Sequence, residues 1–116
     1  MGGNYQKLIV WQKANQLAKE IYQLTQHFLK EELYGLTAQL RRAALSIPTN
    51  IVEGYARQGK NELKHFLNIA LASLAEVEYL LDFSLDIGNF SDEDHKKLQN
   101  LRSEVGGLLW NFFHSI

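Results

Sequence analysis

The stretch Arg41–Gly54, which reads RRAALSIPTNIVEG, decides the fold because it carries a helical repeat of apolar residues past an internal proline. At about 100° per residue, five apolar side chains in and just before this stretch fall on one face of a helix. These side chains are Leu40, Ala43, Ala44, Ile47 and Ile51. Pro48 removes one backbone hydrogen bond. The repeat nevertheless continues to Ile51, so we expect a kink or local bulge at Pro48 and not the end of the helix.

Three further apolar repeats fill the rest of the chain, and no alternating strand pattern competes with them. The four predicted helices cover residues 10–28, 36–57, 62–87 and 92–113. We expect Asn61 to cap the third helix, Gly88 to end it, and Ser91 with Asp94 to cap the fourth. Because the connections are short, neighbouring helices should run antiparallel. The sequence therefore predicts one all-α domain over residues 1–116, an antiparallel up-and-down four-helix bundle.

The composition excludes several classes of protein. The chain has 116 residues with 46% hydrophobic and 22% charged residues, which is ordinary for a globular domain with a substantial core. Its formal net charge of −1 argues against strong nonspecific binding to nucleic acid, although a local basic patch remains possible. No cysteine, signal peptide or stretch of about twenty apolar residues is present, so we expect a cytoplasmic protein that does not span a membrane.

Polar side chains line the flank of the core face, where an unpaired polar group costs free energy. Ser73 and Glu76 project onto the apolar side of the third helix in the same way. We therefore predict a largely buried polar network of Arg42, Ser46, Asn50, Glu53, Ser73 and Glu76. Such a network either fixes the register of the helices or forms a contact site for a ligand or RNA.

A second apolar stripe lies opposite the core face of the second helix. It consists of Ala38, Leu45, Val52 and Ala56 at mostly seven-residue steps, which is typical of a helix-packing seam. Contiguous exposed apolar surface marks partner sites. The stripe therefore predicts a homo-oligomer with Leu45 and Val52 in the subunit interface. The alternative is an irregular bundle in which these side chains lie under loops.

A cluster of basic residues surrounds the turn between the second and third helices. Arg57, Lys60 and Lys64 are candidate nucleic-acid contacts, and Tyr55 could add a stacking ring. The alternative interpretation is an ordinary solvated turn, and Glu62 weakens the positive charge.

The sequence offers little that could carry out chemistry. Two E-x-x-H-like patterns end at His65 and His95, but both begin consecutive antiparallel helices and so lie roughly 30 Å or more apart. They cannot share a metal ion, and solvated helix starts explain both. The carboxylate row of Glu78, Asp82 and Asp86 is interpreted as a solvated face. No nucleophile or phosphate-loop motif is present. We therefore predict no catalytic residue, no cofactor and no metal.

The chain resembles the 23S rRNA intervening-sequence proteins in three segments. These segments are LIVWQKANQLAKEIYQLT (residues 8–25), EELYGLTAQLRRAALSIPTNIVEGYAR (31–57) and ELKHFLNIALASLAEVEYLL (62–81). The resemblance implies an antiparallel bundle that is often a homopentamer, with some members encoded inside inserts in large-subunit rRNA genes. Related bundle proteins are accessory subunits of diversity-generating reverse transcriptases and use a basic surface for nucleic acid. The net charge of −1 departs from that pattern.

Two functional hypotheses follow from these observations. The first is a non-enzymatic, oligomeric bundle protein that associates with ribosomal or other RNA. The second is an oligomeric scaffold for a protein partner, with no role in binding nucleic acid.

Overall fold

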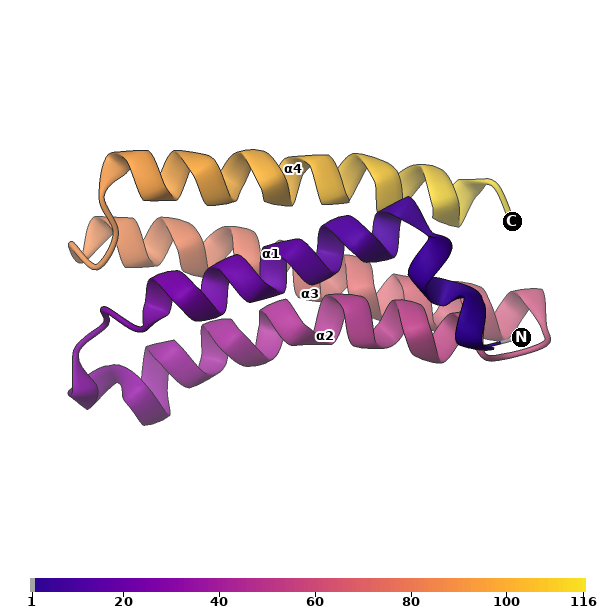
Figure 1. Ribbon diagram of the computed structural model, residues 1–116, viewed down its shortest axis with the longest axis horizontal. Coiled ribbons are helices and arrows are strands. Elements are labelled where there is room, and N and C mark those ends of the chain that lie inside the picture. The colour runs from indigo at the N-terminus through magenta and orange to yellow at the C-terminus, as the bar shows by residue number, and fades with distance from the viewer. Residues whose placement is uncertain (1) are drawn as a thin grey trace.

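The computed structural model, which describes residues 2–116, consists of four long helices joined by short turns (Figure 1). The helices are α1 (Ile9–Thr25), α2 (Ala38–Tyr55), α3 (Lys60–Asp86) and α4 (Asp92–His114). A 3₁₀ turn, η1 (Gly2–Lys7), precedes α1. Two short turns, η2 (Lys30–Glu32) and η3 (Leu33–Thr37), connect α1 to α2.

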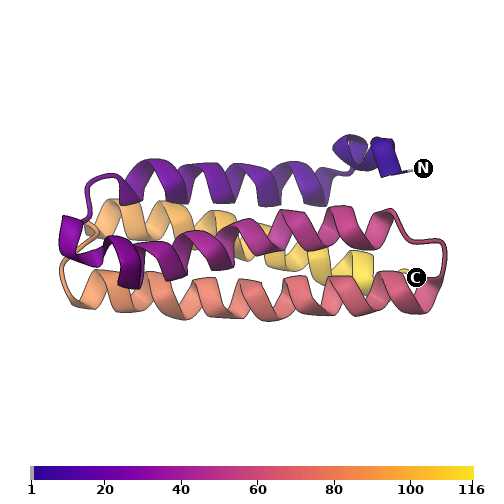
Figure 2. The same cartoon turned by 90° about the horizontal axis from the view of Figure 1, so that it is seen from below.

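Successive helices run antiparallel along a bundle measuring 43 × 24 × 20 Å (Figure 1). Each helix packs on its neighbours in the order α1, α2, α3, α4 and back to α1. The view turned by 90° shows α2 and α3 side by side over most of their length (Figure 2). No strand occurs in the described part of the chain. The predicted fold class is therefore confirmed.

The signals for helix ends are mostly confirmed. Gly88 has a positive φ of 84°. This left-handed conformation is typical of the residue that ends a helix. The Ser91 hydroxyl accepts a hydrogen bond from the backbone N–H of Asp94 at 3.0 Å, which caps α4. The prediction for Asn61 is wrong, because extended Gly59 occupies the cap position and α3 begins at Lys60.

The second helix is a single α-helix through Pro48, which is buried inside it. The prediction that the helix continues past the proline is confirmed, but the expected bulge is absent from α2. The irregular backbone lies instead just before α2. There η3 forms one π-helical turn, and Gly35 leaves helical conformation at φ −106° and ψ −106°.

The core fills the space between the four helices. All five apolar residues predicted for the core face of α2 are buried. Leu17 and Ile21 of α1, Leu67 and Leu81 of α3, and Leu98 and Leu109 of α4 are also completely buried. At the end where α1 finishes and α4 begins, the rings of Phe28 and Phe90 pack with centroids 4.9 Å apart. The faces of α2 and α3 that point away from this core remain available for contacts outside it.

Candidate interaction surfaces of the second helix

The polar flank of α2 forms a short hydrogen-bonded chain with α3. The Ser46 and Ser73 hydroxyls lie 2.8 Å apart. The Asn50 amide nitrogen donates to the Ser46 carbonyl at 2.7 Å and to its hydroxyl at 2.9 Å. All three side chains are half-buried. The contact between Ser46 and Ser73 therefore joins the second and third helices, whereas Asn50 bonds only within α2.

The charged members of the predicted network are not buried, and that part of the prediction is wrong. Arg42, Glu53 and Glu76 are all exposed in the single chain. Glu53 pairs with Arg57 one turn along α2 at 3.4 Å, and Glu76 accepts a hydrogen bond from Gln39 at 3.4 Å. These long side chains start at the border of the core and extend into water, which removes the cost of burying their charges.

Four of the six predicted residues nevertheless line one cleft between α2 and α3. The cleft has a volume of about 200 Å³, and Arg42, Ser46, Ser73 and Glu76 form part of its wall. Its lining includes one positive side chain, one negative side chain and the two paired hydroxyls. The predicted buried network is thus an open polar cleft.

The second apolar stripe faces away from the core, as the sequence predicts. Leu45 is 48% exposed and Val52 is half-buried. Both line a shallow groove between α1 and α2 whose wall also includes Trp11 and Pro48. Trp110 on α4 is 57% exposed. No loop covers Leu45, so its exposure leaves an apolar surface available for a partner.

The basic residues gather at the end of the bundle where α2 finishes and α3 begins. Arg57 pairs with Glu53 at 3.4 Å and lies 4.9 Å from the centroid of the Phe66 ring. The ammonium nitrogen of Lys64 lies 5.5 Å from the centroid of the Phe113 ring. Lys60 is exposed at the first position of α3. The structure therefore brings the three predicted cations together, with two of them held against aromatic rings.

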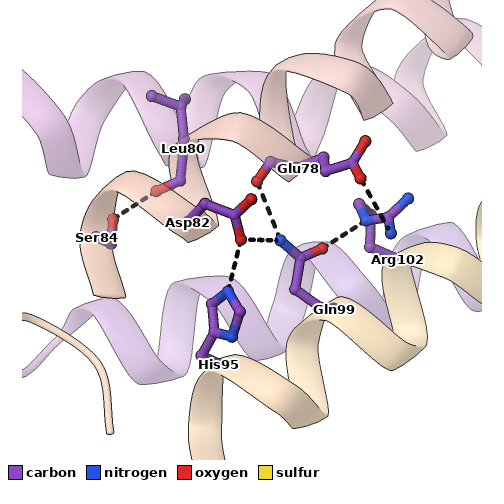
Figure 3. Close-up of polar contacts among 7 residues, drawn as sticks. All are labelled: Glu78, Leu80, Asp82, Ser84, His95, Gln99 and Arg102. Carbon is purple, nitrogen blue, oxygen red and sulfur yellow. Dashed lines mark hydrogen bonds and ion pairs between the residues drawn. The ribbon is translucent and has the colours of Figure 1, made fainter. Parts of the chain in front are cut away.

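Sequence reasoning missed a polar ladder between α3 and α4 (Figure 3). Glu78 pairs with Arg102 at 3.6 Å, and Asp82 lies 2.7 Å from the Nε2 atom of His95. Between them the Gln99 amide nitrogen donates to the Glu78 carbonyl and to the Asp82 carboxylate, both at 3.0 Å. Glu78 and Asp82 are exposed, as the interpretation of a solvated row requires, but the row also pairs with side chains of α4. The available signal was the spacing of His95, Gln99 and Arg102, which matches one face of α4.

The ladder lowers the pKa of Asp82 below its ordinary value. The main cause is the hydrogen bond with His95. Partial burial opposes the effect, while the hydrogen bond from Gln99 and the charges of His95 and Arg102 add to it.

We expect His95→Ala to raise the pKa of Asp82 toward its ordinary value, as measured by carboxyl NMR titration. A carboxyl with a lowered folded-state pKa stabilises the fold above its unfolded pKa of about 3.9, and that contribution is lost as the pH falls through the folded-state value. The wild type should therefore lose more stability on acidification below about pH 4 than His95→Ala loses. Asp82 is 59% exposed, so the difference should stay below about 1 kcal/mol.

The control is His27→Ala, because His27 is exposed and makes no contact with Asp82. An unchanged Asp82 titration in His95→Ala would contradict the assignment of the shift to this hydrogen bond.

The two E-x-x-H-like patterns lie at opposite ends of the bundle, at the starts of α3 and α4 (Figure 1). Among residues 2–116, no group of three or more His, Cys, Asp or Glu side chains is placed to hold a metal ion. Within the same residues, no helix is long and apolar enough to cross a bilayer.

Comparison with known proteins identifies relatives of the whole bundle. The family model described as 23S rRNA-intervening sequence protein matches residues 6–111. A crystal structure of a protein of unknown function from the S23 ribosomal protein family of Bacteroides thetaiotaomicron VPI-5482 superposes with a TM-score of 0.85 at 26% sequence identity. The match covers 98% of this chain and 99% of that chain. No curated protein sequence matches the chain.

Proposed function

The chain belongs to the 23S rRNA-intervening sequence protein family, and from that membership we propose that it is a non-enzymatic, oligomeric bundle protein that associates with RNA. The observation that carries the RNA association is the gathering of Arg57, Lys60 and Lys64 at one end of the bundle. The N-terminus of α3 lies at the same end, and its unpaired backbone N–H groups add a partial positive charge.

Self-association would strengthen the proposed RNA association, because one subunit offers few cations. Each phosphate contact contributes modestly at physiological salt, so three cations give weak binding alone. A ring of subunits repeats the basic end several times, and avidity then compensates for the net charge of −1. We favour a homopentamer, with Leu45 and Val52 in the contact between subunits.

We expect the triple variant Arg57→Gln, Lys60→Gln, Lys64→Gln to lose RNA binding while keeping the oligomeric mass of the wild type. If each subunit makes three phosphate contacts, raising the salt from about 50 to 200 mM should lower the wild-type affinity for single-stranded RNA roughly twentyfold per subunit. Fluorescence anisotropy with labelled RNA over this salt range measures both effects.

The matched control removes the same charge elsewhere. Lys19, Lys96 and Lys97 are exposed and lie away from the basic end, so their replacement by Gln should leave the salt slope unchanged. Equal losses in both triple variants would show that net charge, and not the basic end, attracts the RNA.

The second candidate is a scaffold for a protein partner. It is favoured by the pairing of Arg57 with Glu53 at 3.4 Å, which partly neutralises the basic end, and by the absence of a basic excess. If the wild type fails to bind RNA even at about 50 mM salt, where phosphate contacts are strongest, the RNA association is wrong and the scaffold remains.

A further inference from the structure

A wide groove lies at the other end of α2 from Arg57. It is an open groove of about 450 Å³ between the second half of α1, the η3 turn and the start of α2. Its volume falls within the range of small-molecule sites, about 300–1,000 Å³. Two tyrosines and two arginines contribute to its wall, namely Tyr22, Tyr34, Arg41 and Arg42.

Arg41 is held in place before any ligand arrives. Its Nε donates to the Thr25 hydroxyl at 2.8 Å, and one terminal nitrogen donates to the Tyr22 carbonyl at 3.2 Å. The guanidinium carbon lies 4.8 Å from the centroid of the Tyr22 ring. A guanidinium has five N–H donors, so donors remain for a ligand. Because the side chain is already ordered, binding loses less conformational entropy.

Arg42 gives the groove a second and uncommitted positive charge. It is exposed, and among the described residues no carboxylate pairs with it. No Asp or Glu lines the groove. The groove is therefore a positive region in a chain whose net charge is −1, which favours an anionic ligand.

Tyr34 supplies an exposed aromatic surface beside these charges. It is 92% exposed, and Tyr22 across the groove is 39% exposed. Aromatic rings next to arginines are the usual means by which proteins hold unpaired bases and the phosphates that follow them.

Thr37 provides an independent sign of a missing partner. It lines the groove and is 3% exposed, yet its hydroxyl makes no hydrogen bond. Leaving a buried hydroxyl without a hydrogen-bond partner is unfavourable. Gly35 lies in the same turn with non-helical angles and open space around it.

We propose that this groove binds a nucleoside phosphate unit, with the base stacked on Tyr34 and the phosphate held by Arg41 and Arg42. The unit is either one nucleotide of single-stranded RNA or a free nucleotide. The first source rests on the RNA association proposed above and adds a contact at the opposite end of the bundle. The second source is independent of that association.

The test compares uridine monophosphate, measured by calorimetry, with a single-stranded ten-nucleotide uridine RNA, measured by fluorescence anisotropy, at about 50 mM salt. We expect Arg42→Gln and Tyr34→Ala each to weaken binding of the occupying ligand about tenfold. Both side chains are exposed, so the fold should be retained. The control variants are Lys19→Gln and Tyr79→Ala, which alter an exposed cation and an exposed ring outside the groove and should bind as the wild type does.

The outcomes separate this inference from the proposed function. RNA binding that Arg42→Gln and Tyr34→Ala both weaken supports both ideas. Monophosphate binding without RNA binding supports the groove and contradicts the RNA association. RNA binding that only the Arg57, Lys60 and Lys64 variant weakens overturns the groove alone, and no binding of either ligand overturns both.

One further result would overturn the groove as a nucleotide site. Leu45 borders both the groove and the proposed subunit interface. If Arg42→Gln and Tyr34→Ala lower the oligomeric mass and leave nucleotide binding unchanged, a second copy of the chain occupies the groove instead.

Discussion

Replacing Leu45 and Val52 together by glutamate is expected to convert the proposed oligomer into folded monomers of 13.3 kDa. Both side chains face away from the core and line the groove that contains Trp11. A carboxylate placed there costs the monomer little, because Leu45 is already 48% exposed. In a subunit contact the same charge would be buried without a partner, which is strongly unfavourable. Light scattering at micromolar concentration measures the mass, and circular dichroism checks that the helices remain.

The matched control is Ile9→Glu together with Ile87→Glu. Ile9 at the start of α1 is 61% exposed, and Ile87 just after α3 is 49% exposed. Both lie outside the groove that Leu45 lines. They should leave the mass unchanged. A wild-type monomer would contradict self-association, whereas an oligomer that survives Leu45→Glu with Val52→Glu would place the interface on another face.

Gly54→Leu is expected to destabilise the bundle by about 3 kcal/mol or more, because overpacking a close helix contact forces the backbones apart. A Cβ at Gly54 would lie 3.0 Å from the Phe66 Cβ, 3.0 Å from a Leu63 methyl group and 3.3 Å from the Leu63 carbonyl oxygen. The methyl group can move, but the Cβ and the carbonyl are fixed to α3. Even Gly54→Ala should therefore lose about 1 kcal/mol or more despite the better helix propensity of alanine.

Gly107→Ala provides the control within the same chain. Gly107 lies in α4, and a Cβ added there would meet no atom within 4 Å, so alanine should add stability by up to about 1 kcal/mol. Urea denaturation at one fixed protein concentration compares the variants, since oligomer stability depends on concentration. If Gly54→Ala were as stabilising as Gly107→Ala, α2 and α3 would not be held in close contact at this point.

The helices and the core could be predicted because both depend on the period of apolar residues along the chain. The face from Leu40 to Ile51 was assigned correctly because every turn of α2 repeats it. The sequence marks the turn before α2 by its glycine, Gly35, but the irregular backbone of this turn follows no apolar repeat and could not be predicted.

The polar sites were harder to predict. A helical projection shows which face of its helix a side chain occupies, but not which residue of another helix lies opposite it. Arg42 and Glu76 project to the border of the core, and their length lets the charged groups reach water. The partner of the exposed Asp82 could not be predicted, because nothing in α3 alone indicates that His95 of α4 lies opposite it. That pairing depends on the register between two antiparallel helices, which the turn at Gly88 sets.

The arrangement in which each helix packs on the next one along the chain bears on the order of folding and assembly. The contacts of α1 with α2, of α2 with α3 and of α3 with α4 join helices that are consecutive in the sequence, whereas the contact between α1 and α4 joins its two ends. Helical bundles with such local contacts commonly fold within microseconds to milliseconds. Subunit encounter is a bimolecular step that slows as the protein is diluted. If the chain self-associates as proposed, a subunit should therefore complete its own core before it meets another copy, and assembly should join preformed surfaces.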